Sequence, residues 1–359
     1  MCRAAAALTL FLSVAAASDW MECVGGAAPG GTTTWIRSCE GTNYDHLLGR
    51  VIVVAYWGPS REGARDDVFL MQELHERIYR RGGRLLALTE ASDDATRALL
   101  AEEDLFCAVG VETKIVGGSG SELPYAYVID PKGTVLWQGQ LRELPGKALD
   151  GALRQAKPFG LPRIHDMQEK SAKLYGKGKL VEAACDAMFM AEFSKDYFKG
   201  NARRIQLITE DANYIKARTE AYRAYWWGLV EEGMSRSDFD QVLYALEEIR
   251  LHLGEEPSRA ADFGIRTGDD KRAVEQREGL RKNPLVDRSL KATKSYEALV
   301  GKQESARLTA ATKAQLLQRF EEFQREWDGT CAARRAARRA KWVEGLPVEV
   351  PKGADGTGN

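Results

Sequence analysis

The chain has 359 residues, a length that suits about two domains of ordinary size. Hydrophobic residues make up 44% and charged residues 29%, which excludes a wholly disordered, a collagen-like or a multispanning membrane protein. Lysine and arginine total 51 against 52 aspartates and glutamates, so the formal net charge of −1 gives no electrostatic sign of a nucleic-acid-binding protein. Six cysteines are too few for a scaffold built on disulfides.

Residues 1–17 have the features of a secretory signal peptide. A short start that contains Arg3 precedes an apolar run from Ala4 to Ala17, and the run ends in small residues that suit signal-peptidase cleavage. The run is shorter than the ~18 residues expected of a membrane-spanning helix. A retained anchor is the alternative. We therefore expect an exported protein, periplasmic or extracellular, without stable membrane insertion.

Export changes how the cysteines are interpreted, because an oxidising compartment favours disulfides. Five cysteines remain once the signal peptide is removed. Cys23 and Cys39 flank a Gly/Thr-rich stretch, and we expect them to form a disulfide. A second disulfide, between Cys185 and Cys331, would join the C-terminal helices. Cys107 lies among apolar neighbours, which is typical of a buried and unreactive thiol.

The first half of the chain alternates between strand-like and helix-like segments. The pattern predicts strands at 51–57, 84–90, 125–130 and 134–140, and helices at 61–81, 92–103 and 145–156. The last two strands are joined by the tight turn Pro131-Lys132-Gly133 and must be antiparallel. The first two are linked by a crossover helix and are therefore parallel. The prediction is an α/β domain with a mixed sheet and helices on both faces.

Two segments of this domain resemble the motifs of a known family: GRVIVVAYWGPSRE (Gly49 to Glu62) and LPYAYVIDPKG (Leu123 to Gly133). The first is similar to a strand with an active-site turn, and the second to a segment with a proline, Ile-Asp and a turn glycine. Both motifs are those of thioredoxin-fold redoxins, of the TlpA-like and alkyl hydroperoxide reductase/thiol-specific-antioxidant kind. The resemblance covers residues 42–157. It implies a thioredoxin-like fold in which Pro124 is cis and faces the active-site turn.

The chain departs from the family at the residues that carry its chemistry. A working redoxin has two cysteines, two residues apart, at a helix N-terminus that stabilises the first thiolate. Here Trp57 is followed directly by Gly58, the first cysteine has no counterpart, and Ser60 stands at the position of the second. A serine hydroxyl cannot form a disulfide. The degenerate site comprises Trp57, Gly58, Pro59, Ser60 and Arg61.

Two functional hypotheses follow, and the sequence leaves open whether the protein is an enzyme. The first is a redox-inactive module that binds a peptide or protein through the ancestral redoxin groove, lined by Trp57, Ser60, Leu123 and Pro124. The resemblance supports it, because family members hold a substrate backbone beside the cis-proline. The alternative is a thiol–disulfide oxidoreductase or peroxide-handling protein that uses a displaced cysteine.

Other chemistries find little support in the sequence. The four histidines do not stand at metal-ligand spacing, and we expect no metal site and no cofactor. We interpret the histidines as surface or capping residues. Acidic doublets such as Asp66-Asp67 are interpreted as solvated helix faces, since adjacent residues on a helix point ~100° apart.

The second half of the chain is predicted to be helical. We place the domain boundary in the Pro/Gly-rich linker at 157–162, so residues 18–41 are an N-terminal extension, 163–344 an α-helical domain and 345–359 a disordered tail. Helices are expected at 169–193 (a hairpin), 210–232, 238–253, 270–281 and 310–342. The arginine-rich stretch from Cys331 to Trp342 is interpreted as a solvated helix face, with contact to anionic lipid or an acidic partner as the alternative.

Overall fold

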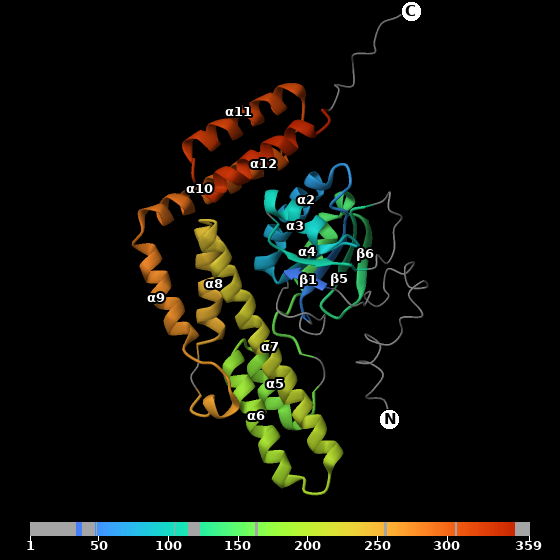
Figure 1. Ribbon diagram of the computed structural model, residues 1–359, viewed down its shortest axis with the longest axis vertical. Helices are drawn as coiled ribbons and strands as arrows, with labels where there is room; N and C mark the ends of the chain where they lie inside the picture. Colours follow the sequence, from blue (N-terminus) through green and yellow to red (C-terminus); the bar gives the residue numbers. More distant parts are fainter. Residues whose placement is uncertain are drawn as a thin grey trace, which may run out of the picture. The chain divides into compact units, whose positions relative to one another are not determined.

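The computed structural model describes residues 34–37, 47, 49–103, 105–113, 123–161, 164–254, 257–305 and 307–348 (Figure 1). The predicted signal peptide, the Cys23–Cys39 disulfide and the tail beyond residue 348 lie outside these residues. The chain divides into two compact units, residues 1–225 with 251–268, and residues 226–250 with 269–359. The domain boundary in the linker at 157–162 stays a prediction, because the helices that directly follow it share the first unit with the sheet.

A six-stranded mixed sheet lies in the first unit (Figure 1). Its strands are in the order β1-β4-β3-β2-β5-β6. They are β1 (Thr34–Arg37), β2 (Val51–Tyr56), β3 (Gly83–Leu88), β4 (Ala108–Val111), β5 (Tyr125–Ile129) and β6 (Val135–Gln140). Strands β2, β3 and β4 are parallel, whereas β1, β5 and β6 run antiparallel to their neighbours. This confirms the predicted mixed sheet.

Helices α2 (Ala64–Ile78), α3 (Asp93–Glu102) and α4 (Gly146–Leu153) follow β2, β3 and β6 along the chain. Because side chains alternate along a strand, β2 contributes side chains to two hydrophobic cores. Val51, Val53 and Ala55 pack in one core with α2 and α4 residues, and Ile52 and Val54 pack in the other, on the opposite face of the sheet. Both faces of β2 are therefore covered, as its unbroken apolar sequence predicts.

Two short strands, β1 and β4, are not predicted from the sequence. Each has four residues. The β4 sequence, Ala-Val-Gly-Val, contains a glycine and an alanine, which have low strand propensity, so its pairing beside β3 rather than its own pattern determines the strand.

Three further helices belong to the first unit together with the sheet: α5 (Glu169–Gly176), α6 (Leu180–Tyr197) and the first 24 residues of α7 (Ala202–Ser235). The first two confirm the predicted helical hairpin. The buried Arg84 of β3 connects the sheet to α7, since its guanidinium lies 4.8 Å from the centre of the Tyr225 ring. Arg218 of α7 also donates a hydrogen bond of 2.6 Å to the carbonyl of Gly160 in the linker.

The second unit contains the end of α7 and the helices that follow, apart from the end of α8, which belongs to the first unit. These helices are α8 (Phe239–His252), α9 (Asp269–Arg281), α10 (Pro284–Ser305), α11 (Ala310–Glu326) and α12 (Cys331–Gly345). Helix α10 is not predicted from the sequence. The prediction of one helix over 310–342 is wrong, because Gly329 has a φ of +81° and Thr330 caps a new helix by accepting a hydrogen bond from the amide of Ala333.

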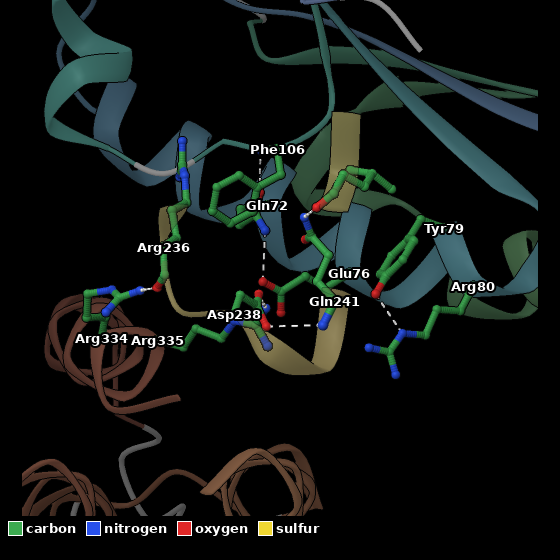
Figure 2. Close-up of polar contacts among 11 residues, drawn as sticks. Gln72, Glu76, Tyr79, Arg80, Phe106, Arg236, Asp238, Gln241, Arg334 and Arg335 are labelled. Carbon is green, nitrogen blue, oxygen red and sulfur yellow. Dashed lines mark hydrogen bonds and ion pairs between the residues drawn. The ribbon is translucent and has the colours of Figure 1, made fainter. Parts of the chain in front are cut away.

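The arginines of α12 are largely internal, which corrects their interpretation as a solvated face. Arg335 pairs at 2.7 Å with the buried Asp238 (Figure 2). Arg339 donates to the side chain of Gln303 at 2.6 Å. Arg334 is exposed and donates to the carbonyl of Arg236. The stretch therefore stabilises the fold from within more than it presents charge to a partner.

Candidate functional site

The candidate site is the turn between β2 and α2. Trp57 continues the sheet by donating its amide hydrogen to the carbonyl of Leu88 at 3.0 Å. The chain then turns, with the Arg61 amide bonded to the carbonyl of Gly58 at 3.2 Å. Gly63 caps the helix with a φ of +82°, a conformation that favours glycine, and α2 begins at Ala64. Ser60 is exposed in the turn and lies four residues before the helix starts.

The side chain of Trp57 does not line a groove. It is 0% exposed and packs in the core between the sheet and helices α2 and α4. A continuous apolar strand with both faces covered places its last ring inside, where burial is favoured. Trp57 therefore supports the turn from beneath, and the prediction that it contacts a bound peptide is wrong.

Leu123 and Pro124 lie beside this turn, and the peptide bond between them is cis, as the resemblance implies. Tyr125 pairs with Tyr56 in the sheet, so the two residues before Tyr125 lie next to the end of β2. Arg61 links the turn to this segment, because its guanidinium donates a hydrogen bond to the Leu123 carbonyl. The structure thus brings Ser60, Arg61 and Leu123 together; Pro124 itself is buried and Leu123 is half-buried.

A buried carboxylate lies behind Arg61. The side chain of Asp67 in the first turn of α2 is only 3% exposed. Arg61 approaches it to 3.8 Å and Arg142, which follows β6, approaches it to 3.6 Å. Burial raises the pKa of the Asp67 carboxyl above its usual value, and the two arginines partly offset that effect.

Asp67 and Arg142 are the residues that sequence reasoning misses. The interpretation of Asp66-Asp67 as a solvated helix face is wrong for Asp67, because the turn places that side chain against the protein. Arg142 reaches the same carboxylate only because β6 pairs with β5 and β5 with β2. No spacing in the sequence indicates this contact.

The cysteines of the described part of the chain are remote from the turn or enclosed. Sheet register aligns Val54 with Leu86 and Leu86 with Ala108, so Cys107 is level with Val53, four residues before Trp57. That level is ~13 Å from Trp57 along the strand, at ~3.3 Å per residue. The preceding residue is held on α2, because the Phe106 amide donates to the buried side chain of Gln72 at 2.8 Å (Figure 2). Cys107 is 1% exposed, as predicted.

The predicted Cys185–Cys331 disulfide is not formed in the structure. Both residues stay in the thiol form, and each is buried within a different compact unit. Burial raises the pKa of the Cys185 thiol to about 11, so it carries little thiolate at neutral pH.

The histidines are placed in different ways. His165 caps a short helical turn by accepting a hydrogen bond from the Met167 amide, as expected of a capping residue, whereas His75 is 3% exposed and is not a surface residue. His46 lies outside the described residues. In the part of the chain that the structure describes, no group of three or more histidine, cysteine, aspartate or glutamate side chains is arranged to hold a metal ion.

The parallel β2-α2-β3 crossover, the antiparallel β5-β6 hairpin and a cis-proline beside the turn after β2 together define the fold of this part of the chain. Residues 51–156 have a thioredoxin-like fold. No protein-family model matches the chain, and no curated protein matches it.

Several solved structures are similar to part of this chain. A thiol-disulfide isomerase from Corynebacterium glutamicum has 20% identity and a TM-score of 0.30, over 37% of this chain and 96% of its own. The thioredoxin domain of a thiol-disulfide oxidoreductase from Bacteroides vulgatus has 16% identity and a TM-score of 0.29, over 37% and 96%. A thioredoxin-family thiol:disulfide interchange protein from Chlorobium tepidum has 15% identity and a TM-score of 0.29, over 37% and 99%.

Proposed function

We propose that this protein is a redox-inactive thioredoxin-fold module that binds an extended peptide segment of a partner protein. The peptide lies between the exposed turn at Ser60 and the Leu123–Pro124 segment. The single observation that carries the proposal is the absence of sulfur from this turn, which has Ser60 where a redoxin needs a thiol.

The electrostatics of the turn support the same conclusion. Asp66 and Asp67 occupy the first turn of α2, and their carboxylates already interact with the positive end of the helix. The positive end of α2 is therefore less available to a thiolate than in a turn without these carboxylates, while Arg61 and Arg142 offset the charge of Asp67.

The geometry beside the cis-proline also supports the proposal. The Arg61 guanidinium donates a hydrogen bond to the Leu123 carbonyl, which is the acceptor beside the cis-proline. The guanidinium side chain is 33% exposed and can turn toward solvent. Peptide binding then exchanges an arginine hydrogen bond for one from the peptide backbone, and the hydrogen bonds of the sheet stay in place.

The proposal places the protein in an exported compartment, delivered by the signal peptide at 1–17, with a protein or peptide as its partner and no nucleic acid. The near-neutral net charge supports the last point. Among the helices of the described residues, none has the length and apolar character needed to cross a bilayer.

Fluorescence anisotropy with fluorescein-labelled, carboxymethylated insulin B chain tests the proposal, because this probe is extended and has no reactive thiol. Ser60→Trp places a bulky ring in the groove. We expect this variant to bind at least ~10-fold more weakly than wild type, about 1.4 kcal/mol. Ser92→Trp is the matched control, since Ser92 is exposed and its side chain makes no capping hydrogen bond.

Insulin reduction and hydrogen peroxide consumption, measured on the same protein, test the redox alternative. Sustained turnover that disappears in Cys107→Ser or Cys39→Ser would replace the binding proposal with a displaced-cysteine oxidoreductase. Absence of turnover together with equal anisotropy in wild type and Ser60→Trp would place recognition elsewhere in the chain.

A further inference from the structure

Helix α6 carries a row of exposed aromatic side chains that the proposed groove does not involve. Phe189, Phe193 and Tyr197 are 42%, 46% and 67% exposed. Their spacing of four residues places them along one face of the helix. The rings of Phe193 and Tyr197 stack, with centres 5.6 Å apart and planes 26° apart. We refer to these three residues as the aromatic ridge.

The aromatic ridge is not needed to pack α6. The helix buries its other side mainly through small residues, among them Ala183, Ala187 and Ala191. Exposed aromatic rings in a row cost solvation free energy without stabilising a core, and such clusters mark interaction surfaces. Phe189 is partly shielded by Arg259, whose guanidinium lies 4.9 Å from the ring centre. Phe193 and Tyr197 are therefore the rings that are most available to a partner.

Positive charge accumulates at the turn between α6 and α7, next to the end of the ridge. Lys195 pairs with Glu192 at 2.7 Å and Lys199 approaches Asp196 at 3.6 Å, so these charges balance locally. The next two cations along the chain, Arg203 and Arg204, form no ion pair with a carboxylate among the described residues.

Arg203 and Arg204 are both exposed at the start of α7. Arg203 donates to the side chain of Gln206 at 3.4 Å, and Arg204 donates to a ring nitrogen of His165 at 3.3 Å. The guanidinium of Arg204 also lies 4.0 Å from the centre of the Phe198 ring. Among the described residues, the two arginines contact an amide, an imidazole and an aromatic ring, so their positive charge faces solvent beside the aromatic rings.

We propose that the aromatic ridge and Arg203–Arg204 form a peripheral contact with an anionic phospholipid membrane. Aromatic side chains favour the headgroup level of a bilayer, and arginines pair with phosphate groups there. The chain as a whole has a net charge of −1, so this local excess of positive charge is what complements an anionic surface. Rings that project from one helix face suit insertion between headgroups better than a protein partner, which usually needs a pocket at the centre of its interface.

Vesicle co-sedimentation of the full chain tests this proposal. The probes are vesicles of phosphatidylcholine alone and vesicles containing about 30 mol % phosphatidylglycerol, an anionic lipid. We expect wild type to bind the anionic vesicles at least ~10-fold more tightly than the neutral vesicles, by attraction of the arginines to the lipid charge. Phe193→Ala/Tyr197→Ala should lose at least ~10-fold in binding to the anionic vesicles. Arg203→Gln/Arg204→Gln should remove the preference for anionic lipid.

Leu285→Ala is the matched control, because Leu285 is 61% exposed and lies on α10, outside the ridge. It should bind as wild type does. All variants change exposed side chains, and circular dichroism checks that each is folded. Absence of wild-type binding, or equal binding by wild type and the aromatic variant, overturns the proposal. Concentration-dependent self-association that disappears in Phe193→Ala/Tyr197→Ala also overturns it, by assigning the ridge to a second copy of the chain.

Discussion

Ser60→Cys tests whether the turn lacks only a sulfur atom or also lacks the electrostatic setting for a thiolate. Ser60 is exposed, so a thiol fits there without a change in packing. An unperturbed thiol has a pKa of ~8.5, and in a redoxin the helix N-terminus lowers the pKa of the first cysteine to ~7 or below, whereas Ser60 stands at the position of the second.

The structure gives a clear expectation for this variant. Helix α2 begins four residues later, at Ala64, and its first turn contains Asp66 and Asp67. Both the delay and the carboxylates weaken stabilisation of an anion at position 60. We expect the introduced thiol to keep a pKa close to ~8.5, with ~3% thiolate at pH ~7. If the turn lowered the pKa to ~6.5, the thiolate fraction at pH ~7 would be ~75%, about 25-fold higher. Alkylation at that pH would then be faster, by less than this factor because the nucleophilicity of a thiolate falls with its pKa.

The rate of iodoacetamide alkylation, followed by mass spectrometry as a function of pH, measures this pKa directly. Lys132→Cys provides the reference, because Lys132 is exposed in the turn between β5 and β6, where no α-helix begins. We expect the two variants to have alkylation midpoints within ~0.5 pH units of each other. A midpoint below pH ~7 for Ser60→Cys alone would refute the reasoning, since it would show that the turn still favours a thiolate.

Three further predictions address the arginines and the buried carboxylate. Arg61→Ala frees the Leu123 carbonyl from its hydrogen bond and should tighten binding of the insulin B-chain probe about five-fold, roughly 1 kcal/mol. Arg142→Ala also removes a cation beside Asp67 but should leave binding of the probe unchanged. Because burial raises the pKa of Asp67, the folded chain takes up that proton at higher pH than the unfolded chain, so this group adds stability as the pH falls. Urea unfolding between pH ~7 and ~4 should therefore show that the free energy of unfolding of Asp67→Asn decreases relative to that of wild type as the pH falls. A difference that stays constant with pH would contradict this. Arg335→Ala leaves a buried carboxylate unpaired and should cost about 3 kcal/mol in the free energy of unfolding, whereas the exposed Arg334→Ala should cost less than about 1 kcal/mol; equal losses would show that the buried pair is not special.

Much of the sheet could be predicted from the sequence, because its central elements have strong local patterns. The apolar run of β2, the amphipathic α2 and the Pro-Lys-Gly turn between β5 and β6 each specify their own structure. Strand β4 has no such pattern and forms because β3 offers an edge. The break between α11 and α12 depends on a positive φ at Gly329, which a helical pattern with alanine and arginine on both sides conceals.

The candidate site could be predicted in its chain-local part only. The turn residues 57–61 and the cis-proline come from contiguous motifs, and the cis bond of Pro124 is what that resemblance implies. The contact from Arg61 to Leu123 is not predicted from the sequence. The burial of Trp57 and the convergence of Arg61 and Arg142 on Asp67 depend on how β2, β5 and β6 are stacked side by side. Charged residues of this kind look like ordinary surface residues until the sheet fixes their neighbours.

The bridge from Arg61 to the Leu123 carbonyl connects residues that are 62 positions apart, and a single side chain provides it. Rotation about the bonds of that side chain is enough to uncover the acceptor, and such rotations of exposed side chains take place in picoseconds to nanoseconds. Occupied and vacant forms should then superpose closely in their backbones and differ in one rotamer. Recognition at this turn would accordingly be fast to begin, and its lifetime would be determined by the peptide rather than by any slow rearrangement of the domain.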